Sequence, residues 1–342
     1  MNIRHIAKQA GVSVATVSRV LNHPENVAPK TREKIERIIA EEEYTPNWFA
    51  RGLNFNKTGT IGIMIPSILN SGYMEIAKGI EDVSHQKNCT TFMCNMEYDT
   101  EKERRYLDQL IQRRVDGIVL ICSCLSEEDI KPAREKNIPM VLVGGGKSDL
   151  EVNKVSVNYK VAAKKAVSHF LEIGYKKVAM LQGNALGVGN EYKAKGYLEM
   201  LKEAGIPFKE EYLMKVENTI EGGYLGAKKL SEMKARPQAI FCSSDIIAFG
   251  AMDAIKDKDM EIPRDIAVVG FDNVRMSNLV EPKLTTVEVP LHKMGVLGAR
   301  LLFDMMDAEE DSRQEPPMNI LLQAKLKIRK SCGHKERIGE IF

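Results

Sequence analysis

The sequence contains no run of apolar residues long enough to cross a membrane. Its N-terminal segment lacks the apolar core of a signal peptide. Its six cysteines are scattered and form no Cys-x-x-Cys pair, so buried free thiols are expected rather than disulfides. These absences predict a soluble cytoplasmic protein without a membrane partner.

The sequence also lacks the motifs that would indicate an enzyme. The glycine-rich stretch 141–149 has Val141 where a phosphate-binding loop needs glycine, and the stretch 182–190 lacks the third glycine of a dinucleotide fingerprint. His85, Cys89 and Cys94 have no fourth partner for a metal. No nucleophile-elbow motif is present. We therefore expect no catalytic residues, no metal and no cofactor.

Acidic residues are absent from the first 24 positions, and this segment has the pattern of a helix-turn-helix. Apolar residues recur at helical spacing over 3–10, Gly11 can end that helix, and Ser13 can cap a second helix over 14–22. Two helices joined this tightly predict a helix-turn-helix. A third helix after Pro29 would close an all-α headpiece.

The second predicted helix has one face available for DNA. Val17 and Val20 share the face that can pack on the first helix. The opposite face is small, polar and cationic, which suits close approach to base edges and phosphates. Its members are Val14, Ala15, Ser18, Arg19 and Asn22. An ordinary helical hairpin with a solvated polar face is the alternative.

Two separated motifs carry a resemblance to a known family. The run AGVS at 10–13 followed by TVSRVLN at 16–22 resembles the signature of the LacI/GalR family of transcription regulators. A second match stands at the spacing of that family's hinge, and its residues are Tyr44, Pro46, Asn47, Ala50, Arg51 and Leu53. The likeness continues to about Cys332, but His5 replaces the usual aspartate.

The resemblance implies contacts with double-stranded DNA. Base edges would be read by Val14, Ala15 and Arg19. Phosphates would be contacted by Ser13, Thr16, Ser18, Asn22 and Thr31. The hinge would contribute Asn47, Ala50, Arg51 and Leu53, with Leu53 as an apolar wedge in the minor groove. Docking of Leu53 on the rest of the protein is the alternative.

After Ile61 the pattern changes to short apolar runs that alternate with amphipathic segments, as in consecutive βαβ units. A second such series begins near Val155, which predicts two α/β lobes with doubly wound parallel sheets. This resembles the two-lobed periplasmic-binding-protein-like core of the family. The chain would cross between lobes near Val157, Pro290 and Ile320.

Four segments follow from these patterns. They are a headpiece at 1–45, a hinge at 46–60, a core for effector binding and dimerisation at 61–332, and a short tail at 333–342. The tail has no heptads that would form a coiled coil. Residues 1–60 hold nine Lys or Arg against six Asp or Glu, so the basic excess lies at the predicted DNA-binding end.

Ligands of doubly wound lobes bind beyond the carboxyl ends of the strands. Within those loops the resemblance indicates five effector-binding candidates, which are Asn70, Tyr73, Lys193, Ser244 and Asp272. For Asp245 a helix N-cap is the favoured interpretation. A sugar or sugar phosphate is the expected small-molecule effector.

Three departures from the sugar-binding members of the family weaken the hydrogen bonding expected to a sugar diol. Lys193 replaces an arginine, Gly144 replaces an aspartate, and Ser71 with Gly72 replaces a Pro-Phe pair. The lysine, the ARGL form of the hinge and GFDN at 270–273 resemble the catabolite-control-protein branch of the family.

Members of that branch are corepressed by a phosphorylated phosphocarrier protein, which suggests a second partner. A cationic face for phosphoserine could be formed by His292, Lys293 and Arg300, although Asp304 adds an opposing charge. A small molecule in the cleft remains the favoured effector, with the phosphocarrier protein as the alternative.

The sequence thus predicts a homodimeric, effector-responsive transcription regulator, most simply a repressor, that reads a pseudo-palindromic operator. Two alternatives come from other classes. One is a sugar-binding receptor or transport protein that shares only the core, and the other is an enzyme on a Rossmann-like scaffold.

Overall fold

The computed structural model of the protein describes residues 2–22, 24–42, 44, 57–146, 150–184, 189–308 and 316–333. The chain divides into two compact units, Met1–Thr58 and Gly59–Phe342. None of the described helices is long and apolar enough to cross a membrane.

The first unit is helical. Its elements are α1 (Ile3–Ala10), α2 (Val14–Asn22), the short η1 (Pro24–Asn26) and α3 (Pro29–Glu41). The Asn2 side chain accepts a hydrogen bond from the His5 amide and caps α1, while Gly11 ends that helix with a left-handed φ of 65°. The helices bury a small apolar core of Ile6, Ala7, Ala10, Val17, Val20, Ile35 and Ile38. The predicted helix-turn-helix and third helix are therefore present.

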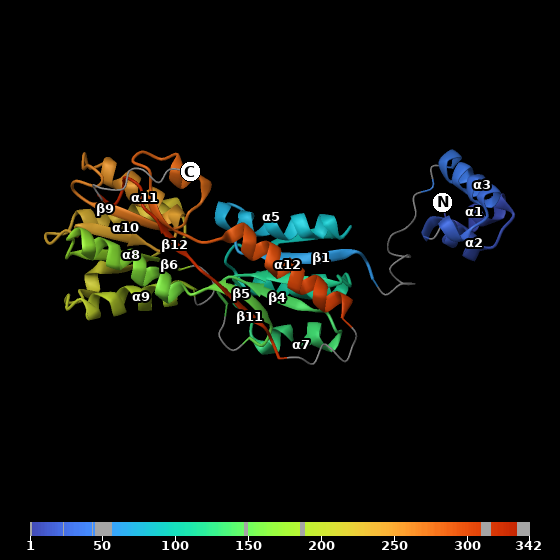
Figure 1. The fold of residues 1–342 in the computed structure, drawn as a ribbon, viewed down its shortest axis with the longest axis horizontal. Coiled ribbons are helices and arrows are strands. Elements are labelled where there is room, and N and C mark those ends of the chain that lie inside the picture. The colour runs from blue at the N-terminus through green and yellow to red at the C-terminus, as the bar shows by residue number, and fades with distance from the viewer. Residues whose placement is uncertain are drawn as a thin grey trace. The chain divides into compact units, whose positions relative to one another are not determined.

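The second unit contains two α/β lobes (Figure 1). The sheet of the first lobe has the order β11-β5-β4-β3-β1-β2, with all neighbours parallel. Its strands are β1 (Thr60–Ile65), β2 (Thr90–Asn95), β3 (Gly117–Ile121), β4 (Met140–Val143), β5 (Asn153–Val157) and β11 (Asn319–Leu322). Its helices are α5 (Ser71–Gln86), α6 (Thr100–Gln112), α7 (Glu127–Glu135) and α12 (Leu291–Asp307).

The sheet of the second lobe has the order β12-β10-β9-β8-β6-β7. Its strands are β6 (Val178–Gly183), β7 (Leu213–Val216), β8 (Ala239–Cys242), β9 (Ala267–Asp272), β10 (Thr285–Glu288) and β12 (Lys325–Lys327). Its helical elements are α8 (Tyr159–Ile173), α9 (Gly189–Glu203), α10 (Ile220–Ser231) and α11 (Asp245–Lys256), with short turns η2 (Glu210–Tyr212) and η3 (Arg275–Asn278). The predicted doubly wound sheets are confirmed, except that the edge strand β12 runs antiparallel to β10.

The chain passes between the lobes at three places, as the sequence predicts. β5 lies in the first sheet and α8 in the second lobe, so the first crossing follows Val157. The second falls between β10 and α12, and the third between β11 and β12. The second lobe is therefore built from the middle of the core sequence together with the C-terminal strand β12.

Side chains on opposite faces of β1 enter different cores. Ile61, Ile63 and Ile65 pack in the core that also contains α5 and α12, whereas Met64 packs in the core beneath α6 and α7. This alternation is the period-two pattern of a strand covered on both faces.

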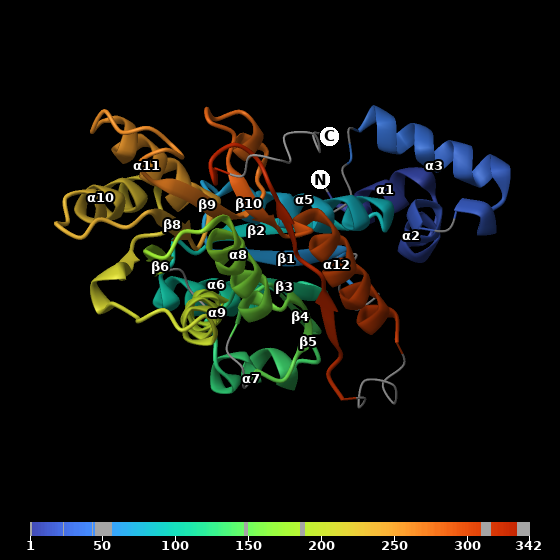
Figure 2. The same ribbon diagram turned by 60° about the vertical axis from the view of Figure 1, so that its left-hand side comes forward.

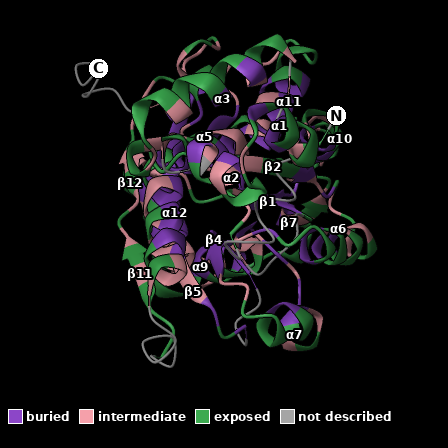
Figure 3. Ribbon diagram, turned by 90° about the vertical axis from the view of Figure 1, so that its right-hand side faces the viewer, coloured by how far each residue is buried: buried purple, intermediate pink, exposed green. Residues whose placement is uncertain are grey.

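Helices α5 and α12 lie side by side on one face of the first sheet (Figure 2). A Cβ atom at Gly79 would overlap the His292 carbonyl, and one at Gly295 would overlap the Ile76 carbonyl. Glycine at these two positions therefore allows the helix backbones to touch. Buried residues run along the length of α12 (Figure 3), which fixes it to the sheet.

Candidate DNA-binding helix and effector cleft

The helix α2 presents its predicted DNA-reading residues to solvent. Val17 and Val20 are buried against the headpiece core, whereas Val14, Ala15 and Arg19 are exposed. No described carboxylate forms an ion pair with Arg19. An arginine on an exposed helix face without an internal partner keeps its guanidinium available for an external acceptor.

The predicted phosphate contacts lie at the start of α2, farther along it to its last residue, and near the start of α3. The Thr16 amide donates to the Ser13 Oγ at 3.1 Å, so Ser13 caps α2, and the two hydroxyls lie 2.9 Å apart. Ser18 and Thr31 are half-buried, and Asn22 ends α2. The predicted hinge residues lie outside the described residues, and they are Asn47, Ala50, Arg51 and Leu53.

His5, which departs from the family pattern, faces the end of α3. Its Nε2 lies 3.9 Å from the Glu42 carboxylate, which also accepts a 2.6 Å hydrogen bond from Gln9. The Gln9 amide lies 3.2 Å from the His5 ring. These contacts tie α1 to the C-terminal end of α3 without using the free face of α2.

In the core, all five effector candidates line one cavity of about 60 Å³ between the lobes. Asn70 lies at the start of α5 and Tyr73 in its first turn, so these two come from the first lobe. Lys193 comes from α9, Ser244 from the N-cap of α11 just after β8, and Asp272 from the end of β9. The structure thus gathers residues from four separate segments at the carboxyl ends of strands, where parallel sheets bind ligands.

Lys193 and Asp272 form the charged part of the cavity. The Lys193 ammonium donates a 2.7 Å hydrogen bond to the Ser243 carbonyl and lies 4.0 Å from the centre of the Phe271 ring. Burial lowers the pKa of Lys193 and raises the pKa of Asp272, and the attraction between them offsets part of each shift. The ammonium is therefore already coordinated by the protein itself.

The first-lobe wall of the cavity is aromatic and amide-rich. Asn70 accepts a hydrogen bond from the Gly72 amide at 2.9 Å, and the Tyr73 and Tyr98 rings meet edge-on. Burial raises the pKa of the Tyr73 hydroxyl well above its usual value. The Asn218 Nδ2 of the second lobe donates to the Tyr98 hydroxyl at 3.2 Å. This bond joins the two lobes across the cavity.

Sequence reasoning missed several residues of this cavity. Cys122, Tyr159, Asn190 and Asn218 also line it. Cys122 directly follows the apolar run of β3, and Tyr159 directly follows the crossing after β5. Their positions after strands were visible in the sequence, but their side chains did not indicate a ligand.

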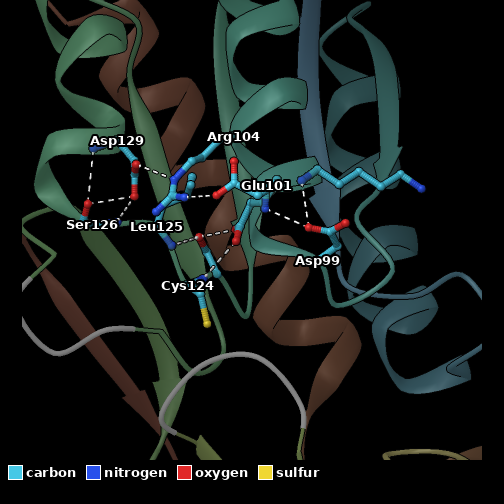
Figure 4. Close-up of polar contacts among 10 residues, drawn as sticks. Asp99, Glu101, Arg104, Cys124, Leu125, Ser126 and Asp129 are labelled. Carbon is cyan, nitrogen blue, oxygen red and sulfur yellow. Dashed lines mark hydrogen bonds and ion pairs between the residues drawn. The ribbon is translucent and has the colours of Figure 1, made fainter.

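A buried carboxylate holds the loop that carries Cys122. Glu103 of α6 is fully buried and accepts hydrogen bonds from the Ser123 hydroxyl at 2.5 Å and from the Cys124 amide at 3.3 Å. Next to it Ser126 and Asp129 form a capping box at the start of α7, and Arg104 bonds to Asp129 (Figure 4). Helix α6 therefore fixes the loop between β3 and α7.

The prediction for Asp245 was wrong. Ser244 occupies the N-cap position of α11, and Asp245 is the first helical residue. Its carboxylate is fully buried and accepts hydrogen bonds from the Val274 amide and from the Ser277 and Thr286 hydroxyls. These donors lie 29 to 41 residues away in sequence, so no local pattern could indicate them.

The predicted cationic face on α12 is exposed, but it is not purely cationic. His292, Lys293 and Arg300 all lie on the surface of α12. The His292 Nε2 lies 2.8 Å from the Asp82 carboxylate of α5. This pairing adds a second opposing acid besides Asp304.

Within the described ranges, no three histidine, cysteine, aspartate or glutamate side chains gather as a metal site would require. A helix-turn-helix unit with an open recognition face stands in one chain with a two-lobed core whose polar cavity lies between the lobes. Together these features define a ligand-binding, DNA-binding regulator.

Comparisons with known proteins give the family. Residues 2–47 match the model described as bacterial regulatory proteins, lacI family, and residues 58–330 match periplasmic binding proteins and sugar binding domain of LacI family. The chain belongs to the LacI family. It is a DNA-binding transcription regulator whose core is a domain of the family's periplasmic-binding-protein and sugar-binding class.

Similar full-length proteins support this assignment. The chain is 34% identical over 310 residues to catabolite control protein A of Priestia megaterium, which covers 90% of this chain and 93% of that protein. It is 31% identical over 329 residues to the transcriptional repressor PurR of Actinobacillus pleuropneumoniae, and this match covers 96% of this chain and 97% of that repressor. The fold is similar to that of the lac repressor dimer bound to operator and an anti-inducer, with a TM-score of 0.84 and 24% sequence identity. The match covers 97% of this chain and 99% of the lac repressor chain. These relatives are regulators and not enzymes or transport proteins.

Proposed function

We propose that the protein is a homodimeric repressor that binds a pseudo-palindromic operator and changes its DNA affinity when a small polyhydroxylated effector enters the core cleft. The headpiece would extend over 1–45, the hinge over 46–60, the core over 61–332 and the tail over 333–342. The matches at 2–47 and 58–330 support this division.

The arrangement of Asp272 carries the effector proposal. Its carboxylate lines the cavity, and no described residue donates a hydrogen bond to it. A carboxylate without an internal donor is suited to accept hydrogen bonds from ligand hydroxyls, while the Tyr73 and Tyr159 rings supply apolar walls for a sugar face. Sugars and sugar phosphates fit this chemistry.

The cavity of about 60 Å³ is smaller than the roughly 300 Å³ at the lower end of small-molecule sites. An effector of sugar size must therefore separate the lobes, which breaks the bond between Asn218 and Tyr98. Lobe opening gives the ligand a difference in affinity between two states, which is what a regulatory effector requires.

A thermal-shift screen of sugars and sugar phosphates, with and without operator DNA, tests the effector proposal. A true effector should raise the unfolding temperature and should shift it differently when DNA is present. If every sugar and sugar phosphate leaves the unfolding temperature unchanged in both conditions, the cleft does not bind this class.

The exposed apolar residues of the core support a homodimer. On the first lobe Ile68 and Leu69 are exposed, as are Phe92 and Met93 on the edge strand β2. On the second lobe the exposed apolar residues include Leu225, Met276 and Leu279. A second copy of the chain would cover such residues on both lobes and would place two headpieces on two half-sites.

On DNA, we propose that Val14, Ala15 and Arg19 read base edges. The phosphate contacts would come from Ser13, Thr16, Ser18, Asn22 and Thr31, and the hinge contacts from Asn47, Ala50, Arg51 and Leu53. The exposure of Arg19 without a described partner supports its role.

A phosphorylated carrier protein acting as corepressor is the second candidate. The 34% identity to catabolite control protein A and the exposed Lys293 and Arg300 favour it. The acidic partner Asp82 beside His292 weakens it, because a phosphoserine would meet a neighbouring carboxylate. The cleft effector therefore stays the leading proposal.

A further inference from the structure

The segment from Asp272 to Leu279 connects two surfaces of the second lobe. It begins in the effector cleft at Asp272 and ends at Leu279, which is 77% exposed, with Met276 between them 52% exposed. The backbone is left-handed at Asp272, with φ 119°, and at Asn273, with φ 58°. Such a conformation costs energy for residues with side chains, so neighbouring contacts must hold it in place.

Asp245 supplies the central contacts of this segment. Its Oδ2 accepts hydrogen bonds from the Val274 amide at 2.9 Å and from the Ser277 hydroxyl at 2.5 Å. Its Oδ1 accepts from the Thr286 hydroxyl of β10 at 2.5 Å. One buried carboxylate therefore binds the segment at two points and ties it to a strand of the sheet.

The surroundings leave the carboxylate little freedom. A Cβ atom at Gly270 would overlap the Asp245 Oδ1, so glycine makes room for it. The Arg329 guanidinium donates to the Asn273 side chain at 2.7 Å and to the Leu284 carbonyl at 2.6 Å. Asp245 and Arg329 thus both bind the segment from Asp272 to Leu279.

We infer that Asp245 is a positioning residue that couples the effector cleft at Asp272 to the exposed apolar surface at Met276 and Leu279. This inference rests on the proposed function, in which Asp272 contacts the effector and a second subunit covers Met276 and Leu279. Because Asp245 holds residues 274 and 277, a change at Asp272 moves the segment as one body instead of being absorbed by local bending. Effector binding is then transmitted to the subunit contact.

The test perturbs Asp272 and measures hydrogen exchange of the amides at residues 274–280. Asp272→Asn removes the charge, and asparagine tolerates the positive φ at this position. The substitution should change exchange by about fivefold or more, at the lower end of ordinary coupling between sites. Ser277→Ala removes one hydrogen bond to Asp245. In the Ser277→Ala background, Asp272→Asn should change the hydrogen exchange of residues 274–280 by less than about twofold.

Ser123→Ala is the matched control. It also removes a 2.5 Å bond between a buried serine hydroxyl and a buried carboxylate, but in the first lobe. In the Ser123→Ala background, Asp272→Asn should still change the hydrogen exchange of residues 274–280 by about fivefold or more. A loss of the effect in the control would show a general loosening of the core and would overturn the inference.

Substitutions at Asp245 separate positioning from simple stability. Asp245→Asn can keep a carbonyl toward Val274 and donate to Thr286, so it should retain the response to Asp272→Asn, whereas Asp245→Ala should lose it. If Asp245→Ala does not fold, the Ser277→Ala comparison decides. A full response in Ser277→Ala overturns the inference.

Sedimentation of the same variants measures the subunit contact. Asp272→Asn should change the dimer dissociation constant, and Ser277→Ala should remove that change. A chain that stays monomeric at every concentration would overturn the proposed dimer and the transmission to it. Hydrogen exchange would still decide whether Asp245 positions the segment.

Discussion

The headpiece and the core place their candidate functional residues in opposite environments. Val14, Ala15 and Arg19 lie exposed on α2, while Val17 and Val20 on the other face build the headpiece core. In the core, by contrast, Lys193 is buried and donates to the Ser243 carbonyl, and Asp272 is half-buried in the cleft. In the headpiece, function and stability should therefore be separable by mutation, whereas in the cleft they should change together.

The largest expected effect is the pH dependence caused by Asp245 in the core. Burial raises the pKa of this carboxyl to about 6, against the opposing hydrogen bonds from Ser277, Thr286 and Val274. The folded protein then binds more protons than the unfolded chain between about pH 4 and pH 6, so its stability falls as pH rises through this window. A shift of about two units corresponds to about 3 kcal/mol.

Chemical denaturation of the wild type and Asp245→Asn from pH 4.5 to 7.5 measures this effect. The asparagine variant should gain about 2 kcal/mol of unfolding free energy relative to the wild type as pH rises. Asp108→Asn, on the exposed side of α6, is the control and should run parallel to the wild type. If the unfolding free energy of Asp245→Asn changes with pH in parallel with that of the wild type, burial does not raise the pKa of the Asp245 carboxyl.

The next effect separates the two candidate effectors. Asp272→Ala should lower affinity for a cleft effector by about 2 kcal/mol, or about thirtyfold, because ligand hydroxyls lose a charged acceptor. Arg300→Ala, exposed on α12, should leave the effector response intact. Operator binding titrated with effector measures both variants. The reverse result, with Arg300→Ala losing regulation, would favour the phosphoprotein corepressor.

The fold was predictable because its signals are local. The period of apolar residues in 3–10 and 14–22 sets the helices of the headpiece, and alternating apolar runs set β1, β3 and β9. The antiparallel strand β12 was not predicted. Its three residues Lys325–Lys327 carry too short a pattern, and its direction depends on pairing with β10 about forty residues earlier.

The cleft was predictable only in part. The resemblance and the strand-end rule indicated Lys193 and Asp272, and both line the cavity. They could not show that the Ser243 carbonyl already accepts from Lys193, or that Asp245 turns inward to bind Ser277 and Thr286. Such contacts join residues far apart in sequence, and an aspartate at a helix start has the same local pattern whether it caps or is buried.

The next prediction concerns Arg19 in the headpiece, where DNA binding and stability should be separable by mutation. Arg19→Ala should weaken operator binding by roughly 1 to 3 kcal/mol and relax preference at one base pair. Because the side chain is exposed, unfolding free energy should change by less than about 0.5 kcal/mol. Binding to an operator series and chemical denaturation test the two parts. Unchanged affinity and preference would remove α2 as the reading helix.

The smallest expected effect belongs to Ser13, where the separation between stability and function in the headpiece should fail. Its hydroxyl caps α2 and is also a predicted phosphate contact. Ser13→Ala should cost about 1 kcal/mol of headpiece stability, whereas Ser13→Gly should cost only a few tenths, since glycine is a tolerable N-cap. Hydrogen exchange of the α2 amides measures this difference.

DNA binding by the two Ser13 variants then separates the roles. Both lack the hydroxyl, so both should lose the same affinity for the operator. The salt dependence should stay unchanged, because a neutral hydroxyl displaces no counterion. If Ser13→Gly binds as tightly as the wild type while Ser13→Ala does not, Ser13 acts on DNA only by holding the helix, and its place among the phosphate contacts is wrong.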